Sequence, residues 1–238
     1  MLGTFLKPGV VLLSAAAGAL GACGVIKPAR MAVPAGLDAA TDHVTITGLG
    51  ASPRGEYRVA DHGGSFTRSA TRLSFFDMAA TDRAKVTFSI SGPLLAGPVN
   101  GRCGLAQRTV NINVVTFTPR PLQFDCSFDG VPGATLVLQE ASDGLAGNLG
   151  QAQRRGYIEV AGTRLALRSA HHVQGSPLPL AAPIGYVFEV DGRAVGAIDL
   201  NGTTPDVLLP KGGSARQAAL LAAVALALVW DPANVIDR

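Results

Sequence analysis

Charged and aromatic side chains are scarce in this chain of 238 residues. Asp, Glu, Lys and Arg make up 16% of the residues, aromatic residues make up 5%, and the formal net charge is only +3. A net charge this small creates no strong electrostatic field, so nucleic acid is excluded as an expected partner. Intrinsic disorder is excluded as well, because it accompanies low hydrophobicity and high net charge.

Sequence motifs of common enzyme and metal sites are also missing. No G-x-S-x-G elbow presents a serine nucleophile. Neither Cys103 nor Cys126 has a second Cys or a His at zinc-ligand spacing. His171 and His172 are adjacent, and neighbouring strand side chains point to opposite faces, so the two imidazoles are not expected to share a metal. We therefore predict no enzymatic activity, no cofactor and no metal site.

The first residues have the pattern of an export signal. One cation, Lys7, precedes an uncharged run from Pro8 to Ala22 that ends in small residues. A short apolar region after a positive start is typical of a signal peptide. The run is shorter than the roughly 20 residues that a membrane-spanning helix needs. We predict that residues 1–22 form a signal peptide.

The sequence Leu20-Gly21-Ala22-Cys23 resembles the bacterial lipobox, in which an aliphatic residue and two small residues precede a cysteine. The resemblance implies a lipoprotein, with diacylglyceryl transfer to Cys23, cleavage before it, and acylation of the new amino terminus, usually with palmitate. Such a triacylated cysteine is a durable membrane anchor. Gly24 stands where lipoproteins of the inner membrane often have Asp, which implies the periplasm-facing outer membrane. A secretory signal with a chance cysteine is the alternative.

Three cysteines are present, and an odd number in an exported protein requires an explanation. If Cys23 carries lipid, Cys103 and Cys126 remain as a pair in an oxidising compartment. A disulfide between them closes a loop of about two dozen residues and contributes on the order of 3 kcal/mol. We predict this disulfide, with two buried free thiols as the alternative.

The mature chain has the pattern of one β domain. Residues 23–41 contain two prolines and no sustained period, so they are predicted to be the lipidated tether of a domain over 42–238. Short β-branched and aromatic runs then recur between turn signals. The sharpest turn signal is Asp191-Gly192, which suits a type I′ hairpin. Twelve strands are predicted, over 43–48, 64–69, 72–76, 84–91, 108–117, 122–128, 134–140, 156–160, 163–169, 185–190, 193–200 and 206–209.

A single helix is predicted over 214–230. Ser214 and Gln217 form a capping-box pattern, and Asp231-Pro232 ends the helix. No charged or hydroxyl side chain occurs from Ala218 to Trp230, so the helix must be shielded on every side. Those residues span about 20 Å as a helix, whereas a bilayer core is about 30 Å thick. We predict a core helix; a membrane-spanning helix and an interfacial helix are the alternatives.

A helix that must be shielded all round requires a surrounding wall. About twelve antiparallel strands can form a mainly β barrel that encloses it, because a barrel of more than about eight strands has room inside. A β-sandwich with the helix packed on one sheet is the alternative fold. In layout, Gly185–Gly202 followed by Leu208–Trp230 resembles the late hairpin and final helix of the tubby C-terminal, phospholipid scramblase and LURP-one-related superfamily. That resemblance implies a twelve-stranded barrel threaded by a C-terminal helix.

Function is less constrained by the sequence. Arg164 and Arg168 share one face of a predicted strand and form a candidate anion-binding patch; an ordinary solvated face is the alternative. We expect a lipid-anchored cell-envelope protein with a non-enzymatic binding or structural role. Its partner would be an envelope protein, an anionic lipid headgroup or a cell-wall component. An exported hydrolase with an unrecognised site and a subunit of an envelope assembly machine are the alternatives.

Overall fold

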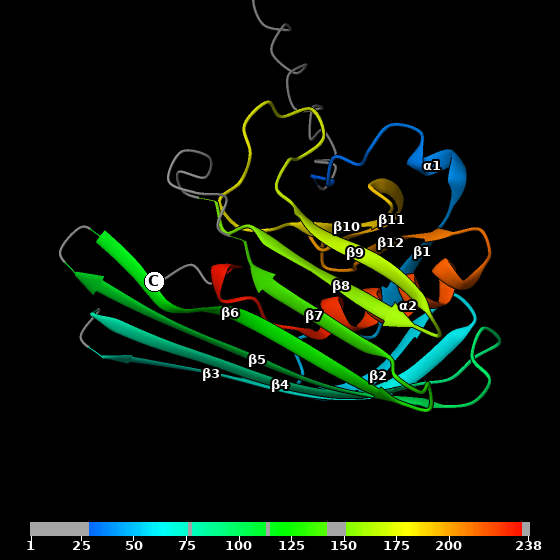
Figure 1. Cartoon of the computed structure of the whole chain (residues 1–238), viewed down its shortest axis with the longest axis horizontal. Helices are drawn as coiled ribbons and strands as arrows, with labels where there is room; N and C mark the ends of the chain where they lie inside the picture. The colour runs from blue at the N-terminus through cyan, green and yellow to red at the C-terminus, as the bar shows by residue number, and fades with distance from the viewer. Residues whose placement is uncertain (1–28, 76–77, 113–114, 142–150, 235–238) are drawn as a thin grey trace, which may run out of the picture.

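The strands close into one barrel. The computed structural model describes residues 29–75, 78–112, 115–141 and 151–234. Within these residues, twelve antiparallel strands pair in sequence order, and β1 pairs with β12 to close the barrel (Figure 1). The predicted mainly β barrel around a C-terminal helix is confirmed. The strands are β1 (Thr41–Thr47), β2 (Arg54–Val59), β3 (His62–Phe75), β4 (Ala79–Ile90), β5 (Val99–Ile112), β6 (Val115–Asp129), β7 (Thr135–Glu140), β8 (Arg154–Val160), β9 (Thr163–Ala170), β10 (Gly185–Val190), β11 (Arg193–Asp199) and β12 (Asp206–Pro210).

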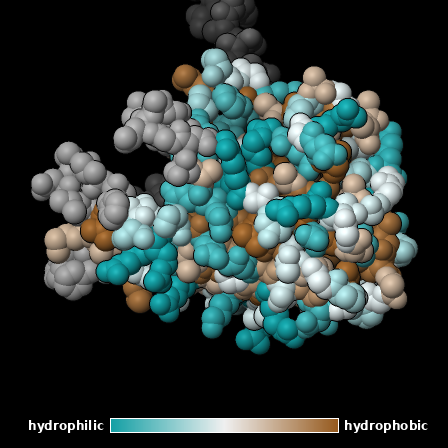
Figure 2. Space-filling model, in the orientation of Figure 1, coloured by the Kyte–Doolittle hydropathy of each residue, from teal (hydrophilic) through white to brown (hydrophobic). Residues whose placement is uncertain are grey.

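Strand length differs between the two sides of the barrel. The consecutive strands β3 to β6 have 12 to 15 residues each and project beyond the others (Figure 1). We call the end from which they project the long-strand end; it also holds Arg154, Ala170 and the end of the helix. The opposite end, where the helix begins after β12, is called the entry end. In Figure 2 the visible outer face of the barrel is mostly teal and white, as expected for a solvated surface.

The C-terminal helix α2 (Ser214–Leu228) fills the lumen. All residues from Ala218 to Leu226 are buried, as is Leu228, and they pack against inward side chains of the strands. The prediction of a core helix is therefore confirmed. No helix among the described residues has the length and apolar character needed to traverse a bilayer.

The helix lies off-centre in the barrel. Its backbone is closest to β8, β9, β11 and β12. Alanines make α2 thin, which allows this close approach. On the other side, larger inward side chains of β3, β4 and β6 fill the space, namely Phe66, Phe88, Phe124 and Phe128. The distribution of side-chain size thus sets where the helix lies within the lumen.

The predicted helix start at Ser214 is confirmed, but the predicted cap and the predicted end need correction. The residue before the helix is Gly213, with φ of 77°, and no side chain caps the first turn, so the Ser214–Gln217 capping box is wrong. At the other end, Val229 is extended and the helix stops two residues before the predicted Trp230. The earlier stop frees Trp230 and Asp231 to make tertiary contacts, described below.

Several predicted strands also differ from the observed ones. The two predicted strands over 64–69 and 72–76 belong to the single strand β3, and β2 was missed. The run 108–117 was predicted as one strand, but Ile112 pairs with Val115 across the hairpin between β5 and β6. β-Branched residues on both sides conceal this turn, because strand propensity alone does not mark where a chain reverses. The correct total of twelve strands therefore includes compensating errors.

The predicted tether is partly integrated into the fold. Its described part, from residue 29, runs along the outside of β10 to β12 and includes the short helix α1 (Leu37–Ala40). Met31 and Leu37 are buried there against Ile184, Ala197 and Leu208. The folded unit therefore begins before the predicted boundary at residue 42, because the outer face of these strands is apolar and needs a cover.

Two other local predictions are confirmed. Asp191 and Gly192 both have positive φ, 50° and 75°, as a type I′ turn between β10 and β11 requires. Cys103 on β5 and Cys126 on β6 form a disulfide, with sulfurs 2.04 Å apart. The two cysteines are direct register partners with buried side chains. The disulfide therefore links two of the projecting strands within the core.

A charge in the middle of α2 should unfold the domain. Val224 is 1% exposed, so Val224→Asp places an unpaired carboxylate in the core and should lower the free energy of unfolding by more than about 4 kcal/mol. Circular dichroism melting measures this change. Ser214→Asp, at the exposed start of the same helix, is the matched control and should retain wild-type stability. A Val224→Asp protein with wild-type melting would contradict the core placement.

Candidate functional site

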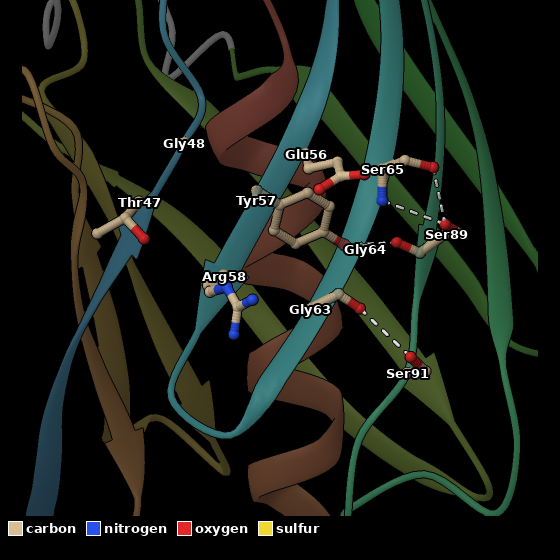
Figure 3. Close-up of a pocket in the computed structure, with 10 residues that line it drawn as sticks. All are labelled: Thr47, Gly48, Glu56, Tyr57, Arg58, Gly63, Gly64, Ser65, Ser89 and Ser91. Carbon is tan, nitrogen blue, oxygen red and sulfur yellow. Dashed lines mark hydrogen bonds between the residues drawn. The ribbon is translucent and has the colours of Figure 1, made fainter.

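Because α2 fills the lumen, we expect a ligand to bind on the outer surface or at an end of the barrel. The described residues form several hollows of the size that small ligands occupy, among them a polar groove and an apolar cleft. The polar groove has a volume of about 710 Å³ and lies over β1 to β4 (Figure 3). The apolar cleft has a volume of about 540 Å³ and lies at the long-strand end, where α2 stops.

The polar groove exists because two strands approach closely. A Cβ atom at Gly64 would lie 1.7 Å from the carbonyl oxygen of Ser89, so only glycine permits this approach. Figure 3 shows Ser65 and Ser89 turned toward each other across the groove. Their hydroxyl oxygens are 3.1 Å apart, and the Ser89 hydroxyl also accepts the Ser65 backbone N–H. The two hydroxyls thus bond to each other, and that of Ser89 also bonds to the Ser65 backbone N–H, which belongs to the groove as well.

Tyr57 forms the floor of this groove. Its ring is buried, and its hydroxyl donates to the Ser89 carbonyl oxygen at 2.9 Å. Burial raises the pKa of the phenol well above its ordinary value. The neutral, hydrogen-bonded phenol serves the packing of β2 against β4. Tyr57, Ser65 and Ser89 thus bond within the groove. The charged side chains of its lining are Glu56 and Arg58.

The apolar cleft has a different character. Its walls come from the inner faces of β3 and β4, the β1–β2 loop and the end of α2, and the residues that line it are Ala51, Pro53, Arg68, Ser69, Ala70, Ala84, Val86, Leu228, Val229 and Trp230. It opens on the side of the lumen that the off-centre helix leaves wider. Trp230 is the only tryptophan of the chain. An apolar hollow with a tryptophan in its wall is suited to a hydrocarbon group.

Arg68 builds one wall of the cleft. Its guanidinium donates to the carbonyl oxygens of Leu49 at 3.1 Å and Ser52 at 3.2 Å, and also to that of Gly50. Its backbone N–H donates to the Pro53 carbonyl oxygen at 2.7 Å. These bonds hold the β1–β2 loop against β3. They also engage the N–H groups of the guanidinium. Arg68 is thus a structural cation, and the cleft remains apolar.

Trp230 is held by a second arginine. The guanidinium of Arg72 lies 5.9 Å from the centroid of the Trp230 ring, within cation–π range. The same guanidinium pairs with Asp82, with Arg72 Nε 2.8 Å from Asp82 Oδ1. Asp82 is fully buried on the inner face of β4. This pair fixes the indole at the rim of the cleft.

A buried ion pair fastens the chain just after the helix. Arg154 Nη2 is 3.1 Å from Asp231 Oδ1 and Arg154 Nε is 3.2 Å from Asp231 Oδ2, with the side chains 1% and 8% exposed. Asp231 also accepts the backbone N–H of Ala233. Burial, together with the charge of Asp231, raises the pKa of the neighbouring Tyr186 phenol. The pair therefore joins the end of α2 to the first residue of β8.

A serine and a histidine lie beside this pair. Ser169 Oγ is 2.9 Å from His171 Nε2 and accepts the Arg154 backbone N–H. His171 Nδ1 is 3.0 Å from the Leu180 carbonyl oxygen, where a catalytic histidine would face a carboxylate. Burial lowers the pKa of His171, so the imidazole is neutral at pH 7. Both side chains are buried, which favours a structural role for the pair.

The predicted anion-binding residues are on one exposed face but are not free. Arg168 Nη2 is 2.8 Å from Glu189 Oε1, and the Arg164 guanidinium lies 3.7 Å from the centroid of the Tyr157 ring. The carboxylate of Glu189 offsets part of the positive charge. Cys23, the predicted lipidation site, lies outside the described residues. Among the described residues, no group of three potential metal ligands comes together.

Sequence reasoning missed the residues that build the long-strand end. Arg154 is one of several arginines near strands, and Asp231 only indicated a helix end. Nothing local marks them as partners, because 77 residues separate them. Searches of protein-family models, curated proteins and solved structures found no match to this chain. The structure alone therefore defines the candidate site, which is the apolar cleft with Trp230 at its rim.

Removing one partner of the buried ion pair should destabilise the barrel strongly. Arg154→Met leaves the Asp231 carboxylate buried and unpaired, which should cost about 3–5 kcal/mol of unfolding free energy in urea titrations. Arg154→Met combined with Asp231→Leu should recover much of that loss. The exposed pair Arg102–Asp129 provides the control, and Arg102→Met should change stability by about 1 kcal/mol or less. Equal losses in the single and double variants would argue against the pair.

Proposed function

We propose that this protein is a lipid-anchored, non-enzymatic binding protein of the bacterial cell envelope, and that its binding site is the apolar cleft. The cleft is the observation that carries the proposal. Its lining is mainly apolar, and its two nearby arginines are committed to carbonyl oxygens and to Asp82. The ligand is therefore expected to present a hydrocarbon group, such as an acyl chain.

The lipobox at Cys23 supports the anchor. The folded unit already begins by residue 31, so a lipid on Cys23 would hold the barrel close to the membrane. Absence of the inner-membrane Asp at position 24 favours the outer membrane, facing the periplasm. A non-catalytic role is supported by the burial of Ser169 and His171, which keeps the hydroxyl away from substrates.

Membership of the tubby C-terminal, phospholipid scramblase and LURP-one-related superfamily is part of the proposal. Twelve strands around a threaded C-terminal helix are consistent with what that resemblance implied. The anion-binding version of the function, through Arg164 and Arg168, has weaker support because Glu189 already pairs with Arg168.

Lipidation is tested at Cys23. Cells supplied with labelled palmitate should incorporate the label into the wild-type protein, and Cys23→Ser should abolish it and leave the precursor unprocessed. Globomycin should block processing of the wild-type protein. The variant Cys103→Ser with Cys126→Ser is the control, because it removes the other two cysteines and should keep the label. Label on Cys23→Ser would exclude this anchor.

Ligand binding is tested with the fluorescence of Trp230, the sole tryptophan. Dibromostearate should quench it saturably, because bromine quenches indole on contact. Ala70 is an exposed residue in the wall of the cleft. Ala70→Asp introduces a carboxylate there and should weaken binding roughly tenfold or more, about 1.4 kcal/mol. The control is Ala96→Asp in the exposed β4–β5 loop. Linear quenching, or quenching unaffected by Ala70→Asp, would rule out the site.

A further inference from the structure

The loop between β9 and β10 exposes two large apolar side chains. Leu178 is 74% exposed and Leu180 is 42% exposed. The segment 173–184 contains no charged side chain. In Figure 2, brown hydrophobic atoms project at the top of the molecule, where Figure 1 shows this loop. An uncharged segment with protruding leucines can enter a hydrocarbon phase without burying a charge.

This loop has a defined conformation. The Leu180 backbone N–H donates to the His171 carbonyl oxygen at 2.7 Å, and His172 bridges to Pro179. The Ser176 side chain bonds to the backbone of Leu178 at 3.2–3.3 Å. Prolines at 177, 179 and 183 restrict the backbone further. The loop therefore presents its leucines in a fixed direction, and little ordering entropy is lost when they meet a surface.

The start of the folded chain is bound to the same loop. Met31 pairs with Val173, the Ala32 N–H donates to the His172 carbonyl oxygen, and the Gln174 N–H donates to the Arg30 carbonyl oxygen. Figure 1 shows the blue start of the described chain beside this loop. The first described residues therefore leave the barrel next to Leu178 and Leu180.

The length of chain before this point limits how far the loop can lie from the membrane. Met31 is the eighth residue after Cys23. Eight residues span at most about 29 Å when fully extended. A lipid on Cys23 therefore keeps the β9–β10 loop within that distance of the membrane surface.

We propose that the β9–β10 loop inserts Leu178 and Leu180 into the membrane that holds the lipid on Cys23, so that the side of the barrel that carries this loop faces the bilayer. The occupant of this apolar surface is thus the outer part of the hydrocarbon layer. The inference rests on the proposed anchor. It adds an orientation of the barrel relative to the bilayer.

The test uses the lipidated full-length protein, reconstituted in phosphatidylethanolamine–phosphatidylglycerol vesicles with brominated acyl chains. A reporter is placed by Leu178→Trp in a Trp230→Phe background, with circular dichroism to verify the fold. Its fluorescence should be quenched at least about twofold relative to vesicles without bromine. Leu94→Trp in the same background is the matched control, because Leu94 is exposed in the β4–β5 loop at the entry end. The fluorescence of this reporter should not be quenched.

The possible outcomes separate the loop from the anchor. Flotation with the vesicles and selective quenching of the Leu178→Trp reporter would support the proposal. Flotation with equal quenching of both reporters, or of neither, would overturn loop insertion and leave the anchor intact. This second result is also expected if the loop binds a protein, or if the barrel docks on headgroups through Arg164 and Arg168. Failure of the wild-type protein to float would overturn the anchor and the inference together.

Discussion

The helix α2 has no polar face, and the rest of the structure depends on shielding it. Its residues from Ala218 to Leu226 are all buried. An open sheet covers only one side of a helix, so complete shielding requires a wall that closes. Pairing of β1 with β12 provides that closure and also removes the exposed strand edges of the sheet. The helix and the barrel thus form one core, with residues drawn from Ile46 through Leu228.

Filling the lumen with protein determines where binding can occur. A ligand cannot occupy the centre of the barrel, so the available hollows lie on the wall or at an end. Three features that bear on binding meet at the long-strand end. The buried Arg154–Asp231 pair fastens the chain after the helix, Arg72 holds Trp230, and the cleft remains beside them. The contacts that secure the helix thereby shape the candidate site.

Much of the fold was predictable from residue patterns. Apolar side chains all round the helix predicted burial, and Asp191-Gly192 predicted a hairpin whose φ values agree. The odd cysteine count pointed to the Cys103–Cys126 disulfide. Predictions failed where a local signal was weak or ambiguous. The Arg, Gly and Glu at the start of β2 concealed a strand, and the β-branched residues around Ile112 concealed a turn.

By itself, the sequence determined the class of architecture, the burial of α2 and the pairing of the cysteines, because each follows from composition or from periodicity along a short stretch. Only the tertiary structure decided the site. Arg154 meets Asp231, Arg72 meets Trp230, and Met31 meets Val173 across separations that no local pattern encodes. Closure of the barrel brings these residues together, since strand order and register set which distant side chains become neighbours.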